Sequence, residues 1–170
     1  MIAARFNSAD LWMIVAIAAL LVLLAFLAVA EMGLSRISKQ KAAAIAERGT
    51  RSAAVLERLV TNPERWVNPL LLTVFIAQIV QSTLTAVVLD RLFGPLGVVI
   101  GVFVNILVFF VLAEAVPKTW AVQHAEKAAL LTARPLSALV ALPPLRWFSR
   151  LLIWVTNVVV RGKGLDKGPF

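Results

Sequence analysis

The residues best suited to chemistry in this 170-residue chain are carboxylates that end long apolar runs. Glu114 directly follows the run Leu96–Ala113, and Pro117 stands three residues later. Proline has no N–H for the carbonyl of Ala113, and its ring crowds that carbonyl. A helix here therefore leaves a free backbone oxygen beside a carboxylate, and hard cations such as Mg²⁺ prefer oxygen ligands. The pattern indicates a cation site at Ala113 and Glu114.

A simpler interpretation of Glu114 stays open. A carboxylate at a membrane boundary can be neutralised by the Lys118 ammonium one helical turn later, without binding an ion. Glu31 ends the first apolar run in the same manner and can pair with Arg36 or Lys39. A structural and a functional role are equally open for Glu31.

The second apolar run contains a group of polar side chains. Gln78 and Ser82 are four residues apart and share one helix face, as do Gln81 and Thr85. Such residues either join helices through hydrogen bonds or line a polar pathway, and the sequence favours neither. For Asn105, in the third run, we expect a hydrogen bond between helices.

Composition excludes several other kinds of site. The chain has no cysteine, which removes disulfides and thiolate metal sites, and the single histidine, His124, is expected at the surface. We recognise no phosphate-binding glycine loop, Ser-His-Asp set or paired catalytic acid, so we do not expect an enzyme. The net charge of +8 suits nucleic acid, but the apolar runs leave no soluble body to bind it.

Three apolar segments must position these residues: Leu11–Ala30, Val67–Leu89 and Leu96–Ala113. The chain is 61% hydrophobic, more than a soluble domain requires. The first run of 20 residues reaches about 30 Å as a helix, enough to cross the hydrocarbon core. It is too long for a signal peptide, and no clean cleavage site follows it.

Polar segments connect these runs. Ser35–Arg65 has apolar residues at helical spacing, which predicts an amphipathic helix with a break near Gly49. It is a solvated connector or a binding surface for anionic lipid or nucleotide. Asn62 and Pro63 predict a helix start, with Asn62 as N-cap. Gly94-Pro95 predicts a tight turn between the second and third spans.

The basic residues predict the orientation. They are concentrated between the first two spans and after the third, whereas the turn between spans two and three has only Arg91, beside Asp90. Basic loops stay in the cytoplasm, so we expect an extracellular N-terminus and a cytoplasmic C-terminus.

The apolar stretch 128–160 is interrupted by basic and proline residues: Arg134, Pro135, Pro143, Pro144, Arg146 and Arg150. Arginine deep in lipid is unfavourable, so we expect helices that lie at the cytoplasmic interface or enter it partway. Trp147 and Trp154 would lie near the headgroups. A fourth span over Leu145–Val160 is the alternative.

Three motifs together resemble the transmembrane domain of the CNNM/CorC family, the cyclin M proteins and their CorB, CorC and haemolysin-C-like relatives. The first span ends in Ala30-Glu31-Met32-Gly33-Leu34, the second follows Asn62-Pro63-Glu64-Arg65, and the third ends in Ala113-Glu114-Ala115-Val116-Pro117-Lys118-Thr119. The last motif, Glu-x-x-Pro-Lys-Thr, is the most specific of the three. The resemblance covers roughly residues 10–160.

The resemblance implies an all-α integral membrane fold with three transmembrane helices, at about 11–32, 67–90 and 96–116. It also implies juxtamembrane or re-entrant amphipathic helices on the cytoplasmic side, at about 35–60 and 122–160. The protein would be a homodimer in the cell membrane. A linker at 161–170 would lead to cytoplasmic CBS domains that bind adenine nucleotide.

The implied function is transport or efflux of a divalent cation, Mg²⁺, with Na⁺ as a candidate coupling ion. Transferring the family's metal site to this chain gives Glu114 as the central ligand, with Ser82, Gln78, Glu31 and the Ala113 carbonyl around it. The family's Gly-Asn-Asn falls on Thr73-Val74-Phe75, so its Asn pair is apolar here. That departure favours the alternative, a membrane scaffold or sensor that anchors cytoplasmic domains and transports nothing.

Overall fold

The structure is a computed structural model that describes residues 7–142, and every secondary-structure element in this range is helical. The chain divides into two compact units. The first unit combines Met1–Ala28 with Val74–Thr119, and the second combines Val29–Thr73 with Trp120–Phe170.

Two helical stretches are long and apolar enough to cross a membrane, namely Ser8–Ser35 with 28 residues and Pro63–Gln123 with 61 residues. The first is helix α1. A straight helix of 61 residues would measure about 90 Å, roughly three times the hydrocarbon thickness. The second stretch is not straight, however, because Gly94 interrupts it.

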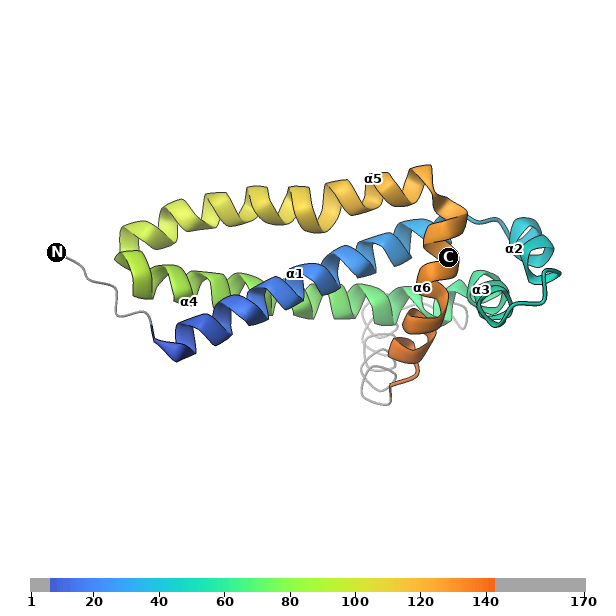
Figure 1. The fold of residues 1–170 in the computed structure, drawn as a ribbon, viewed down its shortest axis with the longest axis horizontal. Coiled ribbons are helices and arrows are strands. Elements are labelled where there is room, and N and C mark those ends of the chain that lie inside the picture. The colour runs from blue at the N-terminus through green and yellow to red at the C-terminus, as the bar shows by residue number, and fades with distance from the viewer. Residues whose placement is uncertain (1–6, 143–170) are drawn as a thin grey trace, which may run out of the picture. The chain divides into compact units, whose positions relative to one another are not determined.

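Helix α4 (Val67–Val108) reverses direction at Gly94, whose φ of 69° and ψ of −167° lie outside the helical region. Glycine adopts such a positive φ without a steric penalty, and Pro95 then begins the returning arm. Figure 1 shows the two arms running back along each other. The predicted turn at Gly94-Pro95 is therefore confirmed.

The two arms of α4 pack closely beside this turn. A Cβ atom at Gly97 would come within 2.1 Å of the Phe93 Cβ, and one at Gly101 within 2.0 Å of the Leu89 Cδ1. A Gly-x-x-x-Gly spacing in an apolar helix often marks contact between two chains. Here both glycines contact the preceding arm of the same chain.

The returning arm changes its helical type before it ends. It continues from α4 into the π-helix η2 (Phe109–Ala115) and then into α5 (Val116–Gln123). In the first unit, Leu24 of α1, Ala77 of α4 and Ala113 of η2 form a buried cluster. Near the turn, the buried Asp10 carboxylate lies 3.4 Å from Nη1 of Arg91.

The second unit contains the short helices α2 (Lys39–Ala46), α3 (Arg51–Thr61) and α6 (Ala125–Val140), with the 3₁₀ turn η1 (Pro63–Arg65). Ser38 and Thr50 cap α2 and α3 by accepting hydrogen bonds from backbone N–H groups. Thr50 follows Gly49, at a φ of 71°, so the predicted break is confirmed. The core of the unit comes from all three helices: Ala42, Ile45, Ala53, Leu56, Leu59, Ala128, Ala129, Ala133 and Leu136.

The last turns of α1 also belong to the second unit, where they meet α6. A Cβ atom at Gly33 would lie 2.9 Å from both the Ala128 Cβ and the Ala129 backbone nitrogen. Only glycine permits this approach. Figure 1 shows α6 running across the end of α1.

One local prediction needs correction. Asn62 does not cap a following helix: its side chain donates a hydrogen bond to the Arg58 carbonyl, 3.1 Å away, and so completes the end of α3. Helix α6 runs through Pro135. Pro135 is exposed, so water can reach the Leu131 carbonyl that loses its N–H partner.

Several sequence predictions lie outside the described residues. These are the fourth span over Leu145–Val160, the interfacial positions of Trp147 and Trp154, and the linker at 161–170.

Candidate functional site

The π-helix η2 determines how Glu114 is presented in the first unit. At its end, the Val116 N–H donates to the Val111 carbonyl, five residues back instead of four. Pro117 explains why the α-helical register fails here, since it can neither donate to the Ala113 carbonyl nor pack against it closely. Single π-helical turns occur frequently at functional sites. The predicted disturbance of the backbone next to Glu114 is therefore present.

Glu114 forms an ion pair with Lys118. The Lys118 Nζ lies 2.9 Å from Glu114 Oε1, and the two side chains are 29% and 40% exposed. Glutamate preceding lysine by four residues is the favourable order for such a pair. The ion pair that the simpler interpretation of Glu114 requires is thus present. A cation at Glu114 would have to compete with the Lys118 ammonium group.

The other candidate oxygens of the first unit lie at similar positions along the helix axes. Ala113 packs in the buried cluster with Ala77, so the π-helix passes α4 at the level of Gln78. Gln78 is half-buried, and Ser82 is exposed one helical turn farther along α4, about 6 Å in axial rise. Ala113, Glu114 and Gln78 therefore lie at similar positions along the helix axes, and Ser82 lies one turn farther along α4.

Glu31 does not belong to this group within the first unit. It is half-buried in the last turns of α1, which are part of the second unit. His124 is exposed, as expected, and its ring stacks on Trp120 at 5.3 Å between centroids.

Gln81 joins the two arms of α4, which is one of the two roles that the sequence left open for the polar residues of the second run. Its side chain is fully buried, and Nε2 donates to Asn105 Oδ1 at 2.8 Å and to Thr85 Oγ1 at 3.0 Å. The bond to Asn105 joins the two arms of α4, which confirms the expected role of Asn105. Its other atom, Oε1, has no hydrogen-bond partner among the described residues. Unsatisfied buried oxygens are rare and call for an explanation.

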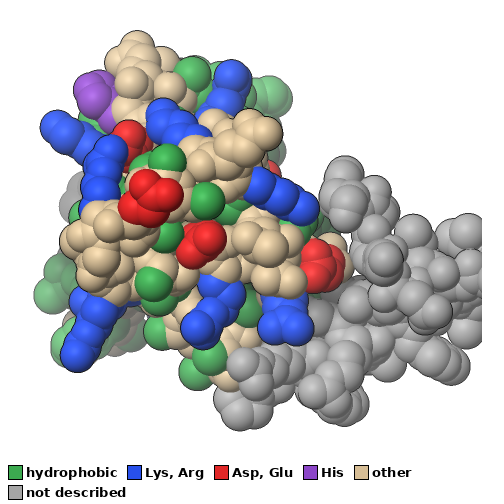
Figure 2. Space-filling model, turned by 90° about the vertical axis from the view of Figure 1, so that its right-hand side faces the viewer, with side chains coloured by type: hydrophobic (Ala, Val, Ile, Leu, Met, Phe, Trp, Pro, Cys, Tyr) green, Lys and Arg blue, Asp and Glu red, His purple; other side chains and the backbone are tan. Residues whose placement is uncertain are grey.

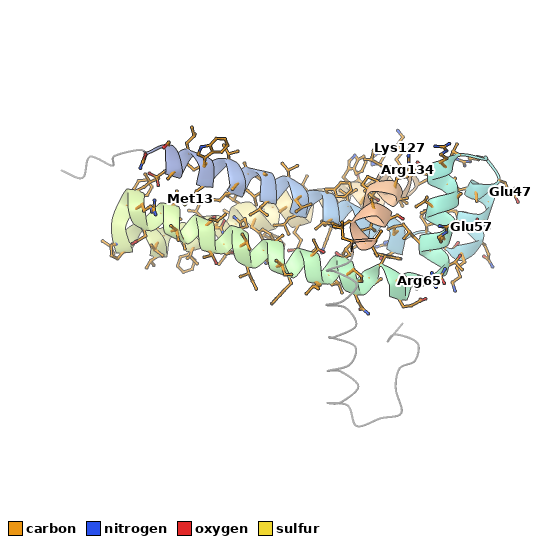
Figure 3. The ribbon with its side chains drawn as sticks, turned by 90° about the horizontal axis from the view of Figure 1, so that it is seen from below. Met13, Glu47, Glu57, Arg65, Lys127 and Arg134 are labelled. Atoms are coloured by element: carbon orange, nitrogen blue, oxygen red, sulfur yellow. The ribbon has the colours of Figure 1, made fainter. Side chains whose placement is uncertain are left out.

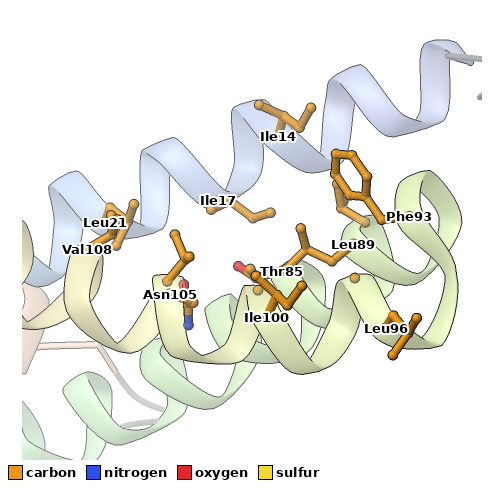
Figure 4. A pocket seen from close by; sticks show the side chains of 14 residues that line it. Ile14, Ile17, Leu21, Thr85, Leu89, Phe93, Leu96, Ile100, Asn105 and Val108 are labelled. Atoms are coloured by element: carbon orange, nitrogen blue, oxygen red, sulfur yellow. The ribbon is translucent and has the colours of Figure 1, made fainter.

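The first unit also contains an apolar groove with a volume of about 600 Å³. Figure 4 shows Ile14, Ile17 and Leu21 of α1 on one side and residues of both α4 arms on the other. Thr85 and Asn105 are its only polar lining residues. Such a lining cannot replace the hydration shell of a cation, so the groove is separate from the candidate site.

No group of three or more His, Cys, Asp or Glu side chains gathers within residues 7–142. A cation bound at Glu114 would therefore depend on one carboxylate and on neutral oxygens, such as those of Gln78, Ser82 and the backbone. Hard cations accept such ligands and retain water molecules to complete their coordination.

Comparison with known proteins supports this description. The cyclin M transmembrane N-terminal domain family matches residues 15–169. The chain is 33% identical over 137 residues to the UPF0053 inner membrane protein YfjD of Escherichia coli, covering 81% of this chain and 31% of that protein. It is 30% identical over 141 residues to a UPF0053 protein of Haemophilus influenzae, covering 83% and 32% respectively.

A UPF0053 protein of Bacillus subtilis, YhdP, is 26% identical over 165 residues, covering 87% of this chain and 35% of that protein. The chain thus spans about a third of the length of these relatives. The family match covers nearly the whole chain and agrees with the helical fold, the apolar spans and the Glu-x-x-Pro-Lys-Thr motif. The chain is therefore a membrane protein of the CNNM/CorC family, to whose cyclin M transmembrane domains it belongs.

Proposed function

We propose that the chain is a divalent-cation transport domain that moves Mg²⁺, with Glu114 as its central ligand. The observation that carries this proposal is the π-helix η2, which includes Glu114 and ends two residues before Pro117, so that the carboxylate stands in a segment without regular α-helical hydrogen bonding. Gln78, Ser82 and the Ala113 carbonyl supply neutral oxygens, and Glu31 is a further candidate. Gln81 Oε1, buried without a described partner, adds one more oxygen to this set.

The proposed topology has three membrane crossings: α1, the first arm of α4, and the returning arm through η2. The division at Gly94 and the apolar character of both arms support it. The N-terminus would be extracellular and the second unit cytoplasmic, because the basic residues gather there. In this proposal two copies form a homodimer in the plasma membrane, and cytoplasmic CBS domains follow in the longer protein.

Ion-dependent thermal stability of the purified chain in detergent tests the proposal. Binding to the folded state alone raises stability, so Mg²⁺ should give a saturable increase in Tm that Ca²⁺ and Na⁺ do not reproduce. Glu114→Gln, which preserves shape and removes the charge, should abolish the increase. Glu57→Gln, at a half-buried glutamate of α3, is the matched control and should retain it. An increase that persists in Glu114→Gln would contradict the assignment of Glu114 as ligand.

The second candidate function is a membrane scaffold or sensor that transports no ion. The Glu114–Lys118 ion pair favours it, since the carboxylate is already neutralised. Val74 and Phe75 also favour it, because they stand where the family resemblance places Asn residues. Wild-type protein without any ion-specific change in Tm, and without Mg²⁺ flux in liposomes, would establish this alternative.

A further inference from the structure

Helix α6 has one buried face and one exposed stripe. The buried residues are Ala128, Ala129, Thr132, Ala133 and Leu136. The exposed ones are Lys127, Leu131, Arg134, Pro135 and Ala138, and their spacing places them on the opposite side of the helix. We call these five residues the α6 stripe.

The composition of the α6 stripe suits a membrane surface. Its two charged residues, Lys127 and Arg134, are both basic, and Leu131 between them is 64% exposed. Figure 3 shows Lys127 and Arg134 together along α6. Long basic side chains can reach phosphate groups while their stems and a neighbouring leucine contact apolar carbon.

The charges of the α6 stripe are not neutralised within the described part of the chain. The neighbouring Glu126 is engaged by Arg48 and by Lys41, whose Nζ lies 4.0 Å from Glu126 Oε2. Neither Lys127 nor Arg134 forms an ion pair with any residue between 7 and 142. The stripe therefore presents uncompensated positive charge, which complements an anionic partner.

The position of α6 within the second unit identifies that partner. Through Gly33, α6 contacts the last turns of α1, a helix that is long and apolar enough to span the membrane. Because α6 crosses the end of α1 (Figure 1), it lies where a span leaves the hydrocarbon and enters the headgroup region. At this depth the abundant anions are lipid phosphates.

We propose that the α6 stripe binds the headgroup phosphate of anionic phospholipids, through Lys127 and Arg134, with Leu131 against the upper acyl carbons. Free phosphate offers the same charge but nothing for Leu131 to contact, so the stripe is assigned to lipid. The proposal depends on the membrane location of the chain and is independent of ion transport.

The test measures thermal unfolding of residues 1–170 in detergent during titration with short-chain phosphatidylglycerol, phosphatidylcholine or inorganic phosphate. Phosphatidylglycerol should give a saturable increase in Tm that the other two do not give. The double variant Lys127→Gln/Arg134→Gln should weaken apparent affinity by roughly 25-fold, about 5-fold for each basic residue. Leu131→Gln, which keeps both charges, should weaken it less.

The matched control is Lys39→Gln/Arg51→Gln, which removes two exposed basic residues from the starts of α2 and α3. Figure 2 shows that Lys and Arg side chains are also spread over the α2 and α3 end of the second unit. The control should retain most of the affinity. An equal loss in both double variants, an equal effect of phosphatidylcholine, or full stabilisation by inorganic phosphate would each overturn the proposal.

Discussion

Glu114 faces two opposing demands, since its ion pair with Lys118 stabilises the helix but competes with any cation at the same carboxylate. A partly exposed pair of this i, i+4 spacing contributes only about 0.3–0.5 kcal/mol where water reaches it, which a divalent ion can outweigh. Lys118 would then act as a tethered competitor that lowers the apparent ion affinity. Removing the Lys118 charge should therefore raise the apparent affinity for the ion.

Lys118→Met should lower the Mg²⁺ concentration needed for half-maximal stabilisation by about 2-fold or more, because the competing ammonium is removed. The measurement is the Mg²⁺ dependence of Tm in detergent. Lys127→Met removes a lysine that has no described carboxylate partner, and its midpoint should stay unchanged. A weaker response in Lys118→Met would mean that Lys118 supports the ion site instead of competing with it.

The Gln81–Asn105 hydrogen bond gives a second prediction at the residue scale. Gln81→Leu should destabilise the protein by about 1 kcal/mol, because Asn105 loses its partner inside the apolar packing. The double variant Gln81→Leu/Asn105→Leu should be less destabilised than the sum of the two single variants, since it leaves no polar group unpaired. Unfolding free energies in detergent provide all three values, and strict additivity would show that the bond contributes nothing.

Predictions about single residues succeed where the covalent structure of one residue decides the outcome. The backbone disturbance before Pro117 follows from the missing proline N–H, so the sequence is sufficient to predict it. Asn62 can cap either of two adjacent helices, and the local sequence does not decide between them. Gln81 Oε1 has no partner among residues 7–142, and this depends on how the two arms of α4 pack, which no pattern within one helix reveals.

At the scale of elements, the approach of α1 to α6 depends on the absence of a side chain at Gly33. Gly33→Ala should destabilise the second unit by about 1–3 kcal/mol, because the new methyl group meets backbone atoms that cannot rotate away. Ala128→Gly in the same chain should restore part of the loss. Thermal unfolding measures both, and a neutral Gly33→Ala would show that the two helices separate easily.

The sequence identifies the elements better than their contacts. Uncharged runs and glycine-proline turns are local signals, so the helices α1 and α4 and the reversal at Gly94 can be predicted from the sequence. Helix α6 runs through Pro135, although proline normally ends or kinks a helix. Its tolerance depends on the exposure of that side of α6, which only the packed structure shows.

At the scale of the whole molecule, the absence of cysteine makes the topology directly testable. With three crossings, single cysteines at Ser8 and Leu96 should react with an impermeant thiol reagent from outside. Cysteines at Gln40 and Gln123 should react only after the membrane is permeabilised. External labelling at Gln123 would exclude a third crossing, and labelling after Val160 separately tests the fourth span.

The contact of Gly33 with α6 also has a mechanical consequence. Backbone lies against backbone there, with no flexible side chain between them to absorb a displacement. A displacement of α6 would therefore move the last turns of α1 with it, and Gly33 lies only two residues from Glu31.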